Sequence, residues 1–196
     1  MGRPAAFDRE DVVRAARDVF WREGYEGASM TALQHATGLN ASSLYHAFGA
    51  KRGLFDAAIN DYLDQVVRPG LAPLRASEVA PEALPDYFRT AREHFADLSG
   101  RTVADGCLLV NAACSGLARD GGVAEVVRAY RAELHAAFTR GAAALRPRRM
   151  PADRERLVET CVSLLISALA MIRVDHSAAL AALDTALSHL EDGSTP

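Results

Sequence analysis

The chain has 196 residues, enough for one domain or for two small domains that share a core. Apolar residues make up 49% of it and charged residues 24%, a balance that excludes a disordered or fibrous chain. The net charge of -3 excludes a protein that coats nucleic acid through bulk positive charge, but it leaves room for a local DNA-binding face.

Apolar residues follow a helical period along nearly the whole chain, so we predict an all-α protein. The first helix begins after Asp8, whose carboxylate suits an N-cap. Phe7 and Val12 stand on either side of it at the spacing of a hydrophobic staple. Gly24 is expected to end this helix, because glycine is favoured where helices terminate.

Two short helices follow, joined by a tight turn. Ser29 is a suitable N-cap for the first, which ends at Gly38. Asn40 caps the second, which is predicted over residues 41–47 and ends at Gly49. Two short helices in this arrangement match a helix-turn-helix, whose second helix enters the major groove of DNA.

The rest of the chain is also predicted to be helical. A fourth helix over residues 51–67 should halt before Pro69, because the residue before a proline is pushed out of the α region. The stretch 68–85, rich in Pro, separates a small N-terminal region from a larger C-terminal one, and the basic segment 146–149 reads as a solvated loop. Further helices, for about nine in all, are expected over 83–99, 103–119, 122–145, 152–173 and 176–191.

The last two predicted helices carry the broadest apolar stripes in the chain. Such stripes suit a bundle shared between subunits, so we predict a homodimer. Burial inside one subunit explains them equally well, and periodicity alone does not choose between the two. The stripes consist of Leu157, Cys161, Leu164, Leu165, Ala168, Ile172, Leu180, Leu183, Leu187 and Leu190.

The outward face of the second short helix decides whether it can meet DNA. Its residues are Ser42, Ser43, Tyr45 and His46. All of them offer hydrogen-bond donors or acceptors and none is an acid, so this face tolerates a polyanion. Arg3 on an N-terminal arm and Lys51 at the start of the fourth helix are placed to hold phosphates. A helical hairpin with no DNA-binding role would show the same spacing, and this alternative stays open.

A wider set of residues in the first 55 positions adds to this pattern. They are Gly24-Tyr25, Ser29-Met30, Leu33, Thr37-Gly38-Leu39, Leu44 to Lys51 and Leu54-Phe55. In residue types and spacing they resemble the DNA-binding domain of TetR-family transcriptional regulators. We therefore predict a helix-turn-helix DNA-binding domain over residues 1–50 and a helical effector-binding and dimerisation domain over residues 51–196.

The resemblance implies roles for individual residues. Tyr45 and Lys51 fall on the family's phosphate contacts, and Ser29 falls on the N-cap of the second helix. Two residues depart from the family's pattern, since Gln34 stands where Ala is common and Ala47 where His is common. The predicted DNA-binding residues are Arg3, Ser29, Thr31, Ala41, Ser42, Ser43, Tyr45, His46 and Lys51.

The resemblance also implies a mode of action. Family members are typically homodimers that bind a palindromic operator and lose affinity when a small molecule occupies the C-terminal domain. We therefore predict three partners: double-stranded operator DNA, a second copy of the chain and a small-molecule effector. We predict a repressor, because steric blocking of a promoter needs no further surface. Effector-binding residues are expected among Phe88, Phe95, Cys107, Val110, Asn111, Cys114 and Tyr130, with Tyr87 and Phe138 as further candidates. Each of these also has an ordinary core explanation.

The segment 106–111 resembles a Gly-Cys-Leu segment in a branch of the family that includes regulators of electrophile and aldehyde detoxification. Cys107 is predicted near the start of a helix, where the helix dipole favours a thiolate and hence a reactive sensor. A free cysteine is also among the most buried residue types, so an inert Cys107 is the alternative.

Other classes of protein are poorly supported. Three cysteines form no secreted disulfide pattern and the N-terminus lacks an apolar segment, so we expect a cytoplasmic protein without membrane insertion. The sequence contains no metal-binding, phosphate-loop or nucleophile motif, so we expect no enzymatic activity, no cofactor and no metal. His135 and His189 are predicted to lie on helix surfaces. The alternative function is a helical ligand-binding or thiol-redox protein that does not bind DNA.

Overall fold

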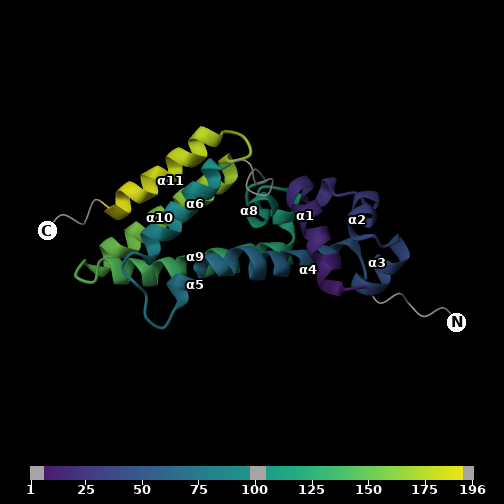
Figure 1. Ribbon diagram of the computed structural model, residues 1–196, viewed down its shortest axis with the longest axis horizontal. Helices are drawn as coiled ribbons and strands as arrows, with labels where there is room; N and C mark the ends of the chain where they lie inside the picture. Colours follow the sequence, from purple (N-terminus) through teal and green to yellow (C-terminus); the bar gives the residue numbers. More distant parts are fainter. Residues whose placement is uncertain (1–6, 98–104, 192–196) are drawn as a thin grey trace. The chain divides into compact units, whose positions relative to one another are not determined.

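The computed structural model describes residues 7–97 and 105–191, and the regular structure in these ranges is helical (Figure 1). The predicted all-α fold class is confirmed. The chain divides into two compact units, residues 1–67 and 68–196. The first unit contains α1 (Arg9–Gly27), α2 (Met30–Thr37), α3 (Ala41–Phe48), α4 (Lys51–Tyr62) and the π-helical turn η1 (Leu63–Val67). Helix α4 packs against α1 within this unit, whereas the division of function at residue 50 stays a prediction.

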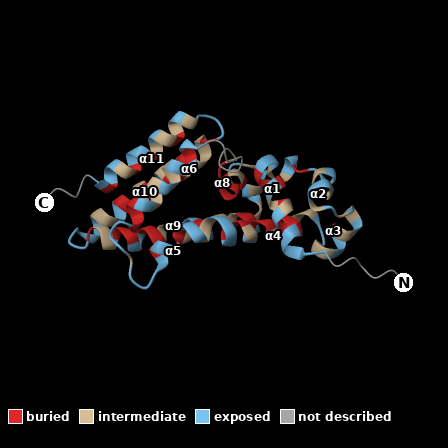
Figure 2. Cartoon of the chain, in the orientation of Figure 1, coloured by how far each residue is buried: buried red, intermediate tan, exposed pale blue. Residues whose placement is uncertain are grey.

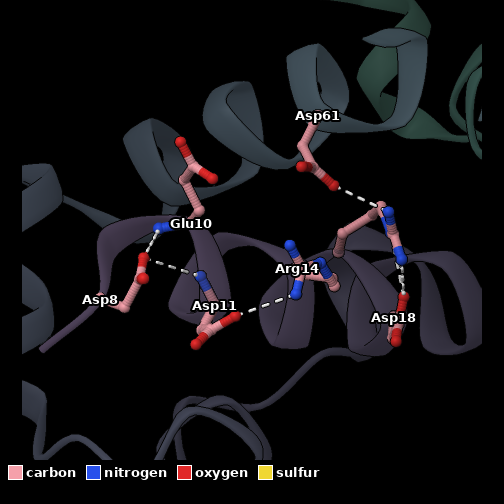
Figure 3. A network of polar contacts seen from close by, with 7 residues as sticks. Asp8, Glu10, Asp11, Arg14, Asp18 and Asp61 are labelled. Atoms are coloured by element: carbon pink, nitrogen blue, oxygen red, sulfur yellow. Dashed lines mark hydrogen bonds and ion pairs between the residues drawn. The ribbon is translucent and has the colours of Figure 1, made fainter. Parts of the chain in front are cut away.

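Helix limits in the first unit follow the predicted capping residues. Asp8 accepts hydrogen bonds from the backbone N–H groups of Glu10 and Asp11 at the start of α1 (Figure 3). Ser29 and Asn40 accept equivalent bonds at the starts of α2 and α3. Gly38 and Gly49 end α2 and α3 with the positive φ that favours glycine. The prediction that Gly24 ends the first helix is wrong, because Gly24 forms a kink within α1, which continues to Gly27.

Aromatic side chains hold α1 and α4 together. The rings of Phe20 and Phe55, both fully buried, meet edge to face with their centroids 5.1 Å apart. Trp21 and Tyr62 form a second edge-to-face pair at 4.8 Å. Large buried rings contribute much of a small core's stability. The short helices α2 and α3 therefore rest on a framework made by α1 and α4, which suits helices too short to be stable alone.

An ion pair fixes the same two helices from the side (Figure 3). Arg17 of α1 donates hydrogen bonds of 2.8 Å to Asp61 of α4 and to its neighbour Asp18. The side chains of Arg17 and Asp61 are only 11% and 15% exposed. The pair between Arg14 and Asp11 is by contrast exposed to solvent. Screening by water is therefore weak for the first pair and strong for the second.

The prediction that the fourth helix halts before Pro69 is wrong. The chain stays helical through η1 and into α5 (Arg68–Arg75), which contains both Pro69 and Pro73. Proline cannot donate the usual backbone hydrogen bond, and its ring crowds the preceding turn of a helix. The wider π turn immediately before α5 provides room at this point, so the helical path continues.

The second unit buries its core between long helices. After α5 it contains α6 (Ala83–Ala96), α8 (Leu108–Ala113), the 3₁₀ turn η2 (Gly116–Arg119), α9 (Gly121–Leu145), α10 (Pro151–Met171) and α11 (His176–Glu191). Helix α11 packs on α10 and α6, and α9 packs on α10, α5 and α6. Figure 2 shows buried residues along these helices, with exposed ones on the outer faces. Phe88 of α6 and Phe138 of α9 are fully buried, with ring centroids 5.4 Å apart.

The helix predicted over residues 103–119 is much shorter than expected. Helix α8 begins at Leu108 and ends at Ala113. Gly106 precedes it with φ +70°, and a Cβ at this position would lie 2.8 Å from the carbonyl oxygen of Leu169 in α10. A glycine is needed there because any side chain would collide with that backbone and would disfavour the left-handed conformation. The close approach of α10 therefore requires a glycine just before α8.

The prediction of a solvated loop over residues 146–149 is wrong at Arg146. This side chain is only 8% exposed, and its guanidinium donates hydrogen bonds of 2.8 Å to the carbonyls of His189 and Leu190. These carbonyls lie at the end of α11, where a positive charge is favourable. Arg146 therefore joins the end of α9 to the end of α11.

The apolar stripes of α10 and α11 are largely used within the unit. Their buried members are Leu157, Cys161, Leu165, Ala168, Ile172, Leu183 and Leu190. Leu164, Leu180 and Leu187 are half-buried, so only part of each stripe is left for another chain. Within the described parts of the chain, no helix is both long and apolar enough to cross a membrane.

Candidate nucleic-acid interface

The turn between α2 and α3 is held by local hydrogen bonds. Thr37 donates a 2.7 Å bond to the carbonyl of Leu33, and its hydroxyl oxygen accepts from the N–H of Leu39. Gly38 takes the left-handed conformation at the end of α2. Asn40 then accepts a 2.9 Å bond from the N–H of Ser43 and begins α3. The turn is tight because each of these bonds closes within a few residues.

Helix α3 separates its polar side chains from its apolar ones. Leu44 is 2% exposed in the core of the unit. Tyr45 is 47% exposed, although a phenol ring usually packs against other residues. Neither α2 nor α3 contains an acidic residue. Of the predicted DNA-binding residues, the exposed ones are Ser29, Thr31, Ser42, Tyr45 and His46, and the half-buried ones are Ala41, Ser43 and Lys51.

Lys51 stands at the start of α4 beside an aromatic ring. Its ammonium nitrogen lies 4.6 Å from the ring centroid of Tyr25, a cation–π distance. Ala50 is the N-cap of α4 and offers no side-chain acceptor to the first N–H groups of that helix. A positive side chain beside the N–H groups of a helix N-terminus suits a phosphate. The resemblance singled out Lys51, but the part that Tyr25 plays in holding it was missed.

Gln34 connects α2 to α3. Its side-chain oxygen accepts a 3.1 Å hydrogen bond from the N–H of Ala41, and its amide nitrogen donates a 3.2 Å bond to the carbonyl of Met30. The first bond satisfies one of the backbone N–H groups that a helix start leaves without a partner. Gln34, which departs from the family's pattern, thus has a structural role in this chain. In the sequence, only its departure from that pattern pointed to such a role.

The other end of α3 is held by α1 and α4. Arg9 of α1 donates a 3.1 Å hydrogen bond to the carbonyl of Ala47, and its guanidinium carbon lies 4.3 Å from the ring centroid of Phe48. A Cβ at Gly53 of α4 would overlap the carbonyl oxygen of Phe48, so only glycine allows this approach. Arg9 and Gly53 were not predicted to matter, because no local pattern shows which helix end they meet. Helix α3 is therefore held at both ends, and its outward side chains lie between these contacts.

Arg3, the remaining predicted DNA-binding residue, lies outside the described residues. Its proposed contact with DNA stays a prediction.

Several of the residues predicted to bind an effector form core. Phe88, Cys107 and Tyr130 are buried, and the Cys107 sulfur lies 3.8 Å from the hydroxyl oxygen of Tyr130. The ring of Tyr87 meets that of Phe138 at 5.1 Å. Burial raises the pKa of Tyr87 well above its usual range, and the nearby Cys107 adds to the rise. The structure thus gathers thiol, phenol and aromatic groups, of which Phe88, Cys107, Tyr130 and Phe138 are buried and Tyr87 is half-buried.

The other effector candidates are spread over different environments. Phe95 and Val110 are buried, whereas Asn111 is half-buried and donates a 2.9 Å hydrogen bond to the carbonyl of Asp105. Cys114 follows α8 and is exposed. Two surface pockets of about 350 and 420 Å³ are lined by other residues of the second unit. Whether any of the candidates binds an effector stays a prediction.

Comparison with known proteins places these features in context. Residues 12–58 match the family model described as bacterial regulatory proteins, tetR family. The chain is 37% identical over 122 residues to the HTH-type transcriptional repressor ComR of Escherichia coli. That match covers 62% of this chain and 56% of ComR, so the chain spans little more than half of this relative.

Two further proteins match over more of their length. An uncharacterized HTH-type transcriptional regulator of Bacillus subtilis, YezE, is 31% identical over 141 residues, which cover 72% of this chain and 71% of YezE. A solved structure of a cysteine mutant of the TetR family transcriptional regulator CifR, complexed with 26-bp double-strand operator DNA, is 34% identical. It superposes with a TM-score of 0.76 over 94% of this chain and 98% of that chain.

Proposed function

Because the chain belongs to the TetR family of bacterial regulatory proteins, we propose that it is a ligand-responsive transcriptional repressor that binds operator DNA. The observation that carries the proposal is the α2–α3 pair, which exposes Tyr45 and His46 and contains no carboxylate. A face of this kind can enter a groove lined with phosphates without a charge conflict. Repression follows most simply, because a protein that occupies a promoter needs no additional surface to block it.

The outward residues of α3 divide into two roles. Tyr45, together with Lys51 at the start of α4, is proposed to contact phosphates, which set the position of the protein on DNA but carry no sequence information. Ser42, Ser43 and His46 are proposed to meet base edges in the major groove, where their donors and acceptors can distinguish base pairs. Arg3, Ser29, Thr31 and Ala41 complete the proposed contact set.

A homodimer is part of the proposal. Two recognition helices read a palindromic operator when they lie about 34 Å apart, one turn of DNA. The half-buried Leu164 of α10 and Leu180 and Leu187 of α11 are apolar surface that a second copy of the chain would cover. Because the DNA of bacteria lies in the cytoplasm, the proposal also places the protein there.

DNA binding is tested by fluorescence anisotropy on the intergenic DNA beside the protein's own gene, at several salt concentrations. We expect Tyr45→Phe and Lys51→Gln to weaken binding. Lys51→Gln should lower the dependence of log K on log salt by about one per protomer, or about two for the homodimer. Arg148→Gln, which removes an exposed cation from the loop before α10, should bind as the wild type does. Binding no tighter than to a scrambled duplex would overturn the proposal in favour of a helical ligand-binding or thiol-redox protein.

The effector is proposed to be a small molecule that acts through the second unit, and Cys107 gives two versions of this proposal. As a sensor it would react with an electrophile after the core around it opens, and as inert core it would serve only packing. Release of DNA by N-ethylmaleimide from the wild type, but not from Cys107→Ser, would establish the sensor. Binding unaffected by the reagent would direct the search to non-covalent ligands.

A further inference from the structure

A histidine and two glutamates meet on the surface of the second unit. His135 lies on α9, and Glu155 and Glu159 lie one turn apart on α10. The Nε2 atom of His135 is 3.1 Å from Oε1 of Glu155 and 3.4 Å from Oε1 of Glu159. Among the residues that the structure describes, no other group of three His, Cys, Asp or Glu side chains brings its ligand atoms within 4.8 Å of one another.

The two distances from the imidazole nitrogen fit the coordination sphere of a small metal ion, and the carboxylate ligand atoms lie within 4.8 Å of each other. Bonds of about 2.1 Å place neighbouring ligand atoms about 3.0 Å apart around an octahedral ion and about 3.4 Å apart around a tetrahedral one. We propose that His135, Glu155 and Glu159 bind a divalent first-row transition-metal ion. One imidazole and two carboxylates on the same side of the ion leave its remaining positions to water or to another ligand.

The surroundings of the three side chains support a cation. Arg131 of α9 donates a 2.6 Å hydrogen bond to Oε2 of Glu159, which turns the other oxygen of this carboxylate toward His135. Hydrogen bonds of this kind commonly orient carboxylates that bind metals. Arg128 also lines the pocket, but its hydrogen bond goes to Glu125. In the described parts of the second unit, Arg131 is therefore the one guanidinium that contacts the carboxylates of the proposed site. Two carboxylates and one guanidinium leave a net negative charge, which favours a divalent cation.

The site has room for an ion and its remaining ligands. His135, Glu155 and Glu159 line an open pocket of about 420 Å³ together with Arg128, Arg131 and Ala132. The imidazole selects the class of ion, because Mg²⁺ and Ca²⁺ prefer oxygen ligands throughout. A bound ion would tie α9 to α10, since it takes ligands from both helices.

Isothermal titration of metal-free protein with Zn²⁺ tests the proposal. The wild type is expected to take up one equivalent more than His135→Ala, and Glu159→Gln is expected to weaken this equivalent by at least about tenfold. His189→Ala serves as the matched control, because it removes another imidazole from the same unit and should leave Zn²⁺ uptake unchanged. Because Zn²⁺ can also bind the exposed Cys114, the difference between variants is the result that counts.

Equal Zn²⁺ uptake by the wild type and His135→Ala would overturn the proposal and leave an ordinary cluster of hydrogen bonds. Tighter binding of Mg²⁺ than of Zn²⁺ would also overturn it, because the imidazole would then have no part in the site. Circular dichroism establishes that each variant is folded. If His135→Ala unfolds, Glu155→Gln, which keeps the shape of the side chain, provides the same comparison. No DNA is needed, so failure of this test is separate from failure of the proposed function.

Discussion

Helix α3 of the first unit exposes Tyr45 and His46, whereas the second unit encloses Cys107 and Tyr130 in its core. The difference fits what each region is proposed to bind. DNA is a large, rigid polyanion that needs no cavity, so the side chains that meet it can stay exposed on a fixed helix. A small molecule has to be surrounded, so an enclosed set of contacts must open before it can be bound.

The three cysteines allow the exposed and the enclosed environments to be compared by their reactivity. Cys114 is exposed, while Cys107 and Cys161 are buried. Burial raises the pKa of Cys161 to about 12, so its thiolate fraction at neutral pH should be about a thousandfold lower than that of an ordinary cysteine. Iodoacetamide followed by mass spectrometry should therefore label Cys114 first, and Cys114→Ser should remove the fast phase. Fast labelling of Cys107 would break the contrast by showing that the core opens readily.

The enclosed core of the second unit should also be costly to disturb. Phe138 is fully buried against Phe88 and Tyr87, so Phe138→Ala should lower the free energy of unfolding by about 3–5 kcal/mol. Val174→Ala, at a position 82% exposed, should change it by less than about 0.5 kcal/mol. Urea denaturation measures both variants. A loss for Phe138→Ala no larger than the control's would contradict a closed core.

A smaller effect is expected within the first unit, at the framework that holds α3. Arg17→Met removes the cation that faces the largely buried Asp61, and it should lower the free energy of unfolding by about 2 kcal/mol. Arg14→Met removes an equally short but exposed pair and should cost less than about 0.5 kcal/mol. Denaturation curves in urea compare the two. Equal losses would show that burial does not decide the strength of these pairs.

The smallest effect is expected at an exposed carboxylate before α11. The N–H of Ala178 and the hydroxyl of Ser177 donate to Asp175 and lower the pKa of this carboxyl. A lowered pKa contributes stability above the ordinary value of about 3.9, and this contribution is lost as the pH falls through the lowered value. The melting temperature of Asp175→Ala should lie below that of the wild type at neutral pH and approach it in acid. A constant difference at every pH would exclude the charge as its source.

The starts of the first three helices could be predicted because their signals are local. Asp8, Ser29 and Asn40 each accept bonds from N–H groups two or three residues ahead, so neighbouring sequence contains the whole interaction. The predicted outward face of α3 is exposed at Ser42, Tyr45 and His46, because period and burial agree in a short helix on a core, whereas its fourth member, Ser43, is half-buried.

Predictions failed where a distant backbone intervened. The helix expected over 103–119 is confined to Leu108–Ala113, and the glycine before it lies against the backbone of α10, a contact that no residue near position 106 reveals. The helix expected to halt before Pro69 continues, because a π turn precedes the proline. The effector candidates were chosen by residue type, and type alone did not separate the buried Cys107 from the exposed Cys114.

By itself, the sequence determined the all-α class, the helix-turn-helix and the family resemblance, because caps, turns and helical periods act over a few neighbouring residues. Only the tertiary structure decided that Arg146 binds the end of α11 and that His135 meets Glu155, contacts between residues 20 to 44 positions apart. A helical period shows which face of a helix is apolar, but it does not show which other helix that face, or the polar residues beside it, will meet.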